Sequence, residues 1–158
     1  MISGKLLRNA FGSFPTGVTV ITSLTKNEAK PFGITISSFN TVSLEPPLIL
    51  WSLGKHSSYL NDLGVGSHHL IHVLHEDQAE LAIRFSKTNP NPFTNLAYTS
   101  DEFGFPCIAN CLAYFLCQVD SIYPGGDHQI IVAKITQLSD PKQGKPLIFS
   151  NSQFASLK

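Results

Sequence analysis

The apolar residues of this chain fall mostly into short runs that are separated by glycine, proline and polar residues. Short runs that are rich in β-branched and aromatic side chains and bounded by turn residues are typical of strands. Proline is tolerated at the first position of a strand, so Pro46 and Pro47 can precede one. We therefore predict strands at residues 18–24, 31–37, 48–53, 69–74, 109–123, 128–138 and 147–149.

Helical spacing of apolar residues appears in only a few segments. Residues 76–86 predict a helix with Leu81 and Phe85 on one face, and residues 56–64 predict a short helix that Gly64 ends. A mostly β fold, a β-barrel with a few short helices, is favoured over a doubly wound α/β fold, which needs helices between most strands. A first helix can be capped by Ser3 and has apolar positions at Leu6, Leu7, Ala10, Phe11 and Phe14.

The composition fits a single domain over residues 1–158 with a substantial core. Only 14% of the residues are charged and the formal net charge is zero, which excludes the basic footprint of a dedicated nucleic-acid-binding protein and favours self-association. No apolar run has the length of a signal peptide or membrane span. Because Cys107, Cys111 and Cys117 include no C-x-x-C pair, we expect buried thiols and a cytoplasmic, reducing compartment.

The segment GITISSFNTVSLEPPLILWSL, residues 33–53, concentrates small hydroxyl side chains between two predicted strands. Serine and threonine offer a donor and acceptors on a short stem, and they leave the neighbouring backbone N–H groups accessible. Several of them at the exit of a strand can hold an anion, often a phosphate. The other interpretation is an alternating strand and turn whose polar face lies in water.

Arg84 and His128 are the other candidates for chemistry, and each has two interpretations. Arg84 is one of only two arginines; it can bind a phosphate in bidentate fashion, or it can complement the last turn of a helix. His128 ends the segment GGDH and begins a predicted strand. Its imidazole can contact a ligand across the mouth of a barrel, or it can be the exposed end of a hairpin turn.

The segment HHLIHVLHED contains four histidines, a composition that suggests a metal site. In a strand, however, His68 and His72 point to one side while His69 and His75 point to the other. The segment also lacks H-E-x-x-H, because Ala79 occupies the place of the second histidine. We therefore expect half-exposed strand histidines and no metal.

Three motifs in order resemble the flavin reductase-like domain family, whose members are FMN-binding split β-barrels. These motifs are LRNAFGSFPTGVTVIT, FGITISSFNTVSLEPPLILWSL and GGDHQIIVAKI. The resemblance runs from about Leu7 to Leu157 and implies a homodimer. It also implies a reductase that uses NADH or NADPH to reduce FMN (or FAD) for a separate monooxygenase. The alternative within this fold is a flavoprotein that is not a reductase, such as an electron carrier or a related oxidase.

The resemblance also assigns site residues by position. It places Thr35, Ser37 and Ser38 against the flavin, with the two serines towards its phosphate or ribityl end. It places Ser52 and Leu53 along the isoalloxazine, and Ser57 and Ser58 near the phosphate. Arg84 and Phe85 lie at the helix end that approaches the cofactor, and His128 faces the nicotinamide. His72 and Trp51 depart from the residues usual at their positions. Direct hydride transfer needs stacking geometry and no activated nucleophile, which agrees with the absence of G-x-S-x-G and similar motifs.

Overall fold

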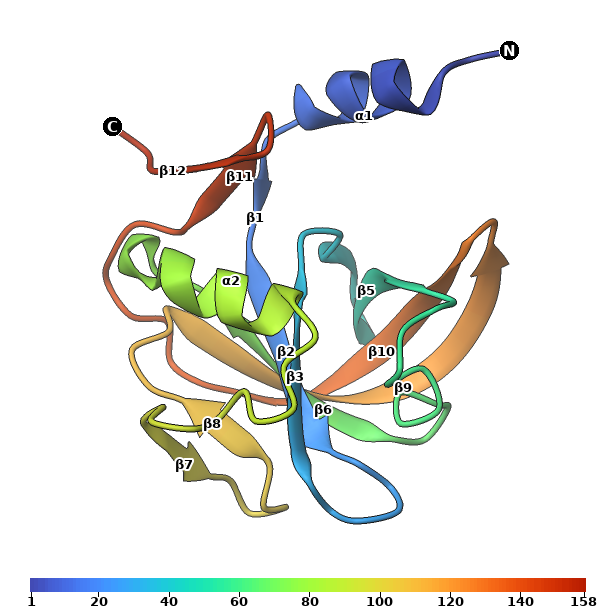
Figure 1. The fold of residues 1–158 in the computed structure, drawn as a ribbon. Helices are drawn as coiled ribbons and strands as arrows, with labels where there is room; N and C mark the ends of the chain where they lie inside the picture. The colour runs from blue at the N-terminus through green and yellow to red at the C-terminus, as the bar shows by residue number, and fades with distance from the viewer.

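The computed structural model describes residues 1–158 and is built mainly from antiparallel strands with two short α-helices. Figure 1 shows a curved sheet with α2 on one side, whereas α1 stands away from the sheet at the N-terminal end of the chain. The fold class predicted from the sequence is confirmed. The elements are α1 Gly4–Gly12, β1 Thr16–Gly17, β2 Thr19–Leu24, β3 Pro31–Ile36, β4 Asn40–Leu44, β5 Pro47–Gly54, β6 His68–Val73, the 3₁₀ helix η1 Glu76–Gln78, α2 Ala79–Ser86, β7 Tyr98–Ser100, β8 Pro106–Ile108, β9 Ala113–Gly125, β10 His128–Leu138, β11 Ile148–Ser150 and β12 Gln153–Ala155.

The main sheet has seven strands in the order β3-β2-β6-β9-β10-β5-β4. Its two edge strands, β3 and β4, do not pair with each other, so the barrel is split. The chain nevertheless passes directly from β3 to β4, because β3 ends at Ile36 and β4 begins at Asn40. Residues 37–39 therefore cross the split. The sequence pattern did not predict β4, because this edge strand is mostly exposed and carries no apolar alternation.

The core has two layers, one inside the barrel and one beneath α2. Residues inside the barrel include Ile21, Trp51, Ile71 and Ile131. A second cluster joins the outer faces of β2 and the end of β6 to α2, through Val20, Leu74, Leu81 and Phe85. Full burial of such a side chain contributes about 1.5–3 kcal/mol. Packing on both faces therefore fixes the positions of β2 and β6.

The helix predicted for residues 56–64 is wrong, because this segment forms consecutive turns. Turn hydrogen bonds run from Ser57 N–H to Gly54 O and from Asp62 N–H to Tyr59 O, both 3.0 Å. The ring of Tyr59 stacks on Phe32 at 4.3 Å, and Leu63 is fully buried. These tertiary contacts override the local helical preference.

The expectation of half-exposed histidines is wrong for His69 and His72, which are 1% and 0% exposed. β6 lies between β2 and β9, and both of its faces are covered. His72 Nδ1–H donates to Val20 O (3.1 Å) and its Nε2 accepts from Ile108 N–H (3.2 Å). Burial lowers the pKa of His72 to about 4. His72 is therefore a neutral connector between β2 and β8.

His69 has a different environment inside the barrel. Its Nε2 lies 2.6 Å from Ser67 Oγ, while Nδ1 is buried without a partner. Burial is the main cause that lowers the pKa of His69 to about 3, and the neighbouring His68 lowers it further. The histidine-rich strand is thus part of the core, and no group of three or more histidine, cysteine or acidic residues is arranged to hold a metal ion.

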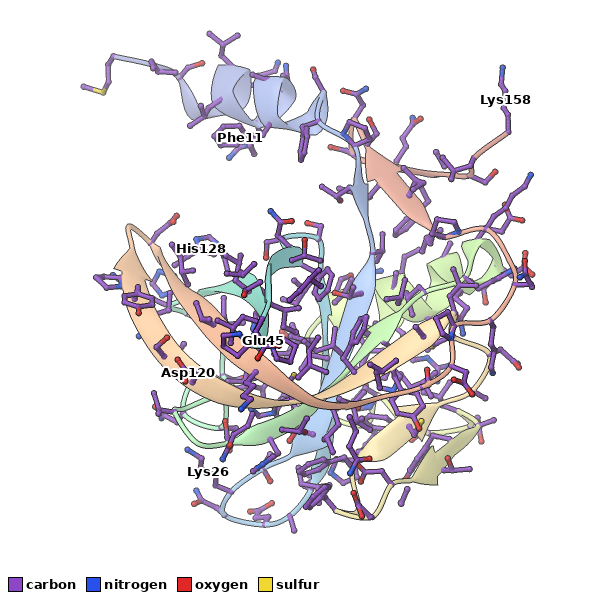
Figure 2. All side chains as sticks on the ribbon, turned by 180° about the vertical axis from the view of Figure 1, so that it is seen from behind. Phe11, Lys26, Glu45, Asp120, His128 and Lys158 are labelled. Atoms are coloured by element: carbon purple, nitrogen blue, oxygen red, sulfur yellow. The ribbon has the colours of Figure 1, made fainter.

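The predicted N-terminal helix is confirmed. Its predicted cap is also confirmed, because Ser3 Oγ accepts a hydrogen bond from Leu6 N–H. The helix buries none of its own residues. Phe11 and Phe14 are 67% and 75% exposed, and Figure 2 shows Phe11 on the helix that stands off the barrel. Neither α-helix has the length and apolar composition needed to traverse a lipid bilayer.

Candidate functional site

A cavity of about 360 Å³ opens where the chain crosses the split, and we call it the rim cavity. Residues from the end of β3, the end of β5, the following turn and the start of β10 line it. The structure thus brings together most of the residues that the sequence predicted. Its lining consists of Ile34, Thr35, Ile36, Ser37, Ser38, Ser52, Leu53, Gly54, Ser57 and His128.

Strand pairing and a serine hydroxyl fix the walls of the rim cavity. His128 pairs with Gly54 across β10 and β5, which places the imidazole beside the end of β5. On the other side, Ser38 Oγ accepts from Ser52 N–H (2.9 Å) and donates to Ser52 O (3.2 Å). Both walls are therefore tied to the same strand, β5.

The hydroxyl groups of this cavity differ in how they are bonded. Thr35 Oγ1 donates to Ala82 O of α2 at 2.6 Å, so it joins β3 to the helix. The Ser38 hydroxyl is already hydrogen-bonded to the backbone of Ser52. Ser37 is exposed and its hydroxyl makes no hydrogen bond within the protein. Ser37 is therefore the hydroxyl of this loop that is free for a ligand.

β5 presents alternate residues to the core and to the rim cavity. Leu53 is 4% exposed and its side chain belongs to the barrel core, while its backbone pairs with Gln129 of β10. Ser52 is half-buried and, by the alternation of a strand, points to the opposite face from Leu53. The two neighbours thus contribute different parts of one wall.

His128 lies at the open side of the cavity, at the tip of the β9–β10 hairpin (Figure 2). Its side chain is 48% exposed, and Nδ1 lies 2.7 Å from Asp127 Oδ1. The hydrogen bond from His128 lowers the pKa of the Asp127 carboxyl below its ordinary value, and the charge of His128 adds to this effect. With Nδ1 directed at the carboxylate, Nε2 is the ring nitrogen left for a ligand.

The turn before His128 is held in place by its backbone. Gly126 has a φ of +68°, a conformation that favours glycine. Lys55 N–H donates to Asp127 O at 3.0 Å, which joins the hairpin to the turn after β5. Asp127 was not predicted as a site residue, although the GGDH motif that singled out His128 contains it.

A second cavity of about 490 Å³, the tail cavity, adjoins the first and shares Ile34 and Ser57 with it. It contains the predicted residues Ser58 and Phe85. Phe85 is 4% exposed and its ring lies against Gly33, where a Cβ atom would come within 2.5 Å. Phe85 therefore belongs to the core and forms a wall of the cavity. The other residues that line the tail cavity are Gly33, His56, Tyr59, Ser86, Lys87, Thr88, Asn89, Pro90 and Pro92.

Arg84 is separated from the other predicted residues. Its NH1 group donates to Thr94 O (3.2 Å) and Pro92 O (3.4 Å), and the side chain lines a third cavity on the outer side of α2. Phe85 lines the tail cavity and not this third one, whereas Arg84 lines the third cavity and not the tail cavity. Lys87, which was not predicted, borders both the tail cavity and the third one.

Comparisons with known proteins identify relatives of this chain. It is 40% identical to FMN reductase (NADH) SmoA of Agrobacterium fabrum, over 96% of this chain and 85% of that protein. It is 31% identical to the reductase subunit HsaB of a flavin-dependent monooxygenase of Rhodococcus jostii, over 99% of this chain and 80% of that protein. The solved structure of NADH:FAD oxidoreductase SgcE6 of Streptomyces globisporus, in complex with NAD and FAD fragments, matches with a TM-score of 0.90 and 31% identity, covering 100% of this chain and 96% of that one. Residues 11–158 also match the family described as flavin reductase like domain, to which this chain therefore belongs.

Proposed function

We propose that this protein is an NAD(P)H-dependent flavin reductase that reduces FMN or FAD and supplies it to a separate monooxygenase. The observation that carries the proposal is the rim cavity, where Ser37, Ser52 and His128 converge at the split of the barrel. The relatives support it by name, since SmoA is an FMN reductase (NADH) and HsaB is a reductase subunit. Family membership supports the same activity.

The residues of the two adjoining cavities suit a flavin. Ligand cavities of about 300–1,000 Å³ are typical of small-molecule sites, and the rim and tail cavities of 360 and 490 Å³ are each within that range. A flavin supplies the hydride acceptor when it is bound. We assign the ring to the rim cavity, against Ser52 and Leu53, and the ribityl side to Thr35, Ser37 and Ser38. The phosphate-bearing tail lies towards Ser57, Ser58 and the wall that Phe85 forms.

His128 has the proposed role of orienting the nicotinamide. It lies on the open side of the rim cavity, with Asp127 fixing one ring nitrogen and the other left free. Hydride transfer requires the two rings in near-attack geometry, so a group that holds the donor contributes to the rate without accepting a proton. Asp127 acts through His128 as a positioning residue.

Arg84 has a proposed role at the phosphate end of the flavin. Its guanidinium holds the carbonyls of Pro92 and Thr94, and Pro92 borders the tail cavity. The C-terminal end of α2 points its carbonyl groups toward this region, which disfavours an anion. Arg84 and Lys87 offset that effect by their charge.

The activity can be tested with purified protein, NADH or NADPH, and added FMN or FAD. A reductase oxidises the nicotinamide continuously when free flavin is present, and we expect turnover to rise with flavin concentration to saturation. An electron carrier would instead retain its flavin through purification and show little turnover. That second result would contradict the proposal.

We also propose a homodimer, supported by the unpartnered helix α1. Leu6 and Phe11 of the helix and Phe14 just after it are 63%, 67% and 75% exposed, and no residue of the helix is buried. Exposed apolar clusters of this kind mark interaction sites. Light scattering should give twice the monomer mass, and Phe11→Asp should shift the protein toward monomer. A monomeric wild-type protein would exclude the dimer.

A cytoplasmic location is proposed from the thiols. Cys107, Cys111 and Cys117 are all free, and burial raises the pKa of Cys117 to about 12. Such thiols persist without pairing in a reducing compartment. Fractionation of the native host should therefore find the protein with the cytoplasmic fraction.

A further inference from the structure

The largest cavity of the molecule lies on the outer side of α2 and takes no part in holding the flavin ring. It has a volume of about 740 Å³, and we call it the α2 groove. Cavities of this size are typical of small-molecule sites. The groove meets the tail cavity along the segment Lys87–Pro90, which lines both. A molecule bound in the α2 groove therefore shares a wall with the flavin tail.

Three charged side chains that line the α2 groove have no oppositely charged partner. The ion pairs of the protein join only histidine to aspartate, which leaves Glu80, Arg84 and Lys87 unpaired. This is unexpected for Glu80 and Arg84, because residues four apart on a helix are neighbours that commonly pair. Arg84 donates instead to the carbonyls of Pro92 and Thr94, and it does so through Nη1 alone. Its Nε and Nη2 groups are therefore left for a ligand.

These charges define the two ends of a ligand. Arg84 and Lys87 lie at the end that meets the tail cavity, and the free edge of the Arg84 guanidinium has the paired donors that bind a carboxylate in bidentate fashion. Glu80 lies four residues before Arg84 and seven before Lys87, which is about 6 Å and about 10 Å along the helix. The groove is thus suited to an organic acid that carries a hydrogen-bond donor at its opposite end.

The α2 groove is apolar between these two ends. Leu81 and Ile83 follow Glu80 along α2, and Leu96 and Ile108 also line the groove. Leu81 and Ile108 are 9% and 4% exposed and belong to the core beneath α2, so this part of the surface is fixed by packing. An apolar surface with a few polar groups at its ends holds and orients an aromatic ring.

We propose that the α2 groove binds a small aromatic acid with a hydroxyl or amino group at its far end, and that this acid weakens the binding of FMN. Arg84 and Lys87 bind the carboxylate, and Glu80 accepts a hydrogen bond from the far end. The effect on FMN rests on the proposed function, which places the flavin phosphate in the tail cavity. Lys87 borders both cavities, so an anion in the groove reduces the positive charge that the phosphate meets.

The binding site can be tested with para-hydroxycinnamate and two probes that each lack one end of it. Its methyl ester lacks the negative charge, and cinnamate lacks the hydroxyl. Titration calorimetry without flavin should show that the ester binds about tenfold or more weakly and cinnamate about threefold more weakly than para-hydroxycinnamate. Glu80 is exposed, so Glu80→Ala should fold normally. In that variant the difference between para-hydroxycinnamate and cinnamate should disappear.

A steric change locates the acid in the groove. Ile83 lines the α2 groove and neither the rim cavity nor the tail cavity, and it is 40% exposed. Ile83→Trp fills the groove and should weaken para-hydroxycinnamate about tenfold or more, while FMN measured without the acid changes by less than about threefold. Ile83→Leu is the matched control and should bind both as the wild type does. If Ile83→Trp does not fold, Ala97→Trp fills the same groove from another exposed position.

The effect on the flavin is measured by fluorescence titration of FMN and riboflavin, with and without saturating para-hydroxycinnamate. We expect the acid to weaken FMN about fivefold and to leave riboflavin unchanged, because riboflavin has no phosphate. Coupling between two binding sites is reciprocal, so FMN should weaken the acid by the same factor. Ile83→Trp should remove the effect, and Ile83→Leu should retain it.

The proposal is overturned if para-hydroxycinnamate does not bind, or if it binds Ile83→Trp and the wild type equally. Equal weakening of FMN and riboflavin would place the acid in the rim cavity, in competition with the flavin ring, and would overturn it too. Unchanged FMN affinity with the acid bound would overturn the coupling. Failure of the wild type to bind any flavin, with the acid still bound in the groove, would contradict the proposed function and not the acid site.

Discussion

The polar groups of strand β6 and those of the rim cavity have opposite arrangements. His72 is 0% exposed and both of its ring nitrogens are bonded to backbone groups of neighbouring strands. Ser37 is exposed without a partner, and His128, which lines the cavity, has one ring nitrogen bonded and the other without a partner in the protein. Polar groups that are fully bonded inside the protein hold the fold, and those with unused bonding capacity are the ones available to a ligand.

The comparison predicts that acid weakens the fold through the buried histidines. The pKa values of His72 and His69 are lowered to about 4 and about 3 in the folded protein. The unfolded chain binds protons at an ordinary histidine pKa near 6.5, so stability is present above that pH and is lost as the pH falls toward 4. Urea denaturation should show that the free energy of unfolding is lower at pH 4.5 than at pH 7 by several kcal/mol. Each histidine contributes about 1.4 kcal/mol for each pH unit between its unfolded pKa and the lower pH. If the free energy of unfolding were the same at both pH values, these histidines would not be buried in their neutral form.

His72→Leu should cost about 3 kcal/mol of unfolding free energy. The change leaves the carbonyl of Val20 and the N–H of Ile108 buried without partners, and each such group costs about 1–3 kcal/mol. FMN affinity of the folded fraction should stay the same. His128→Ala is the control and should alter stability by less than about 0.5 kcal/mol. Equal losses for both variants would remove the distinction between the two regions.

His128→Ala should lower kcat/KM for the nicotinamide about tenfold or more, equivalent to about 1.4 kcal/mol. Flavin affinity should change by less than about threefold, because His128 stands at the open side of the cavity. The kinetics require one flavin at saturating concentration. Asp127→Asn should cause a smaller loss of the same kind, since it acts through His128. Normal nicotinamide kinetics in His128→Ala would reduce this residue to part of a turn.

Arg84→Ala should weaken the binding of FMN by about fivefold or more. It should weaken the binding of riboflavin much less, because only FMN carries a phosphate. The same change frees the carbonyls of Pro92 and Thr94. Titration of both ligands separates the two effects, since loosening of the segment alone would weaken both ligands equally. That outcome would mean that Arg84, like His72, holds the fold and does not bind the ligand.

Ser37→Ala should weaken FMN binding by a few-fold, because it removes one hydrogen bond of about 0.5–1.5 kcal/mol. Ser38→Ala is a useful contrast, because its hydroxyl is already bonded to Ser52 and its loss should lower stability as well. The double variant should weaken FMN about tenfold. An unchanged dissociation constant in the double variant would exclude this loop from the flavin site.

The sequence predicted most strands and most of the rim cavity, and its failures have identifiable causes. Short runs rich in β-branched and aromatic residues marked β2, β3 and β5, although of these three strands only β5 alternates regularly in burial. The burial of His69 and His72 could not be seen in the pattern, because coverage of both faces depends on elements distant in sequence. The turns of residues 56–64 depend on the stacking of Tyr59 on Phe32. Arg84 and Phe85 line different cavities, and this depends on what packs against each side of α2.

The crossing of the split by residues 37–39 has a consequence for protein engineering. β3 and β4 are the edges of the sheet and are not paired to each other, so the length of this crossing is not fixed by a strand register. An insertion there would widen the mouth of the barrel while the seven strands keep their pairing. Loop grafting at this one place is therefore a direct way to change which electron acceptors the barrel admits.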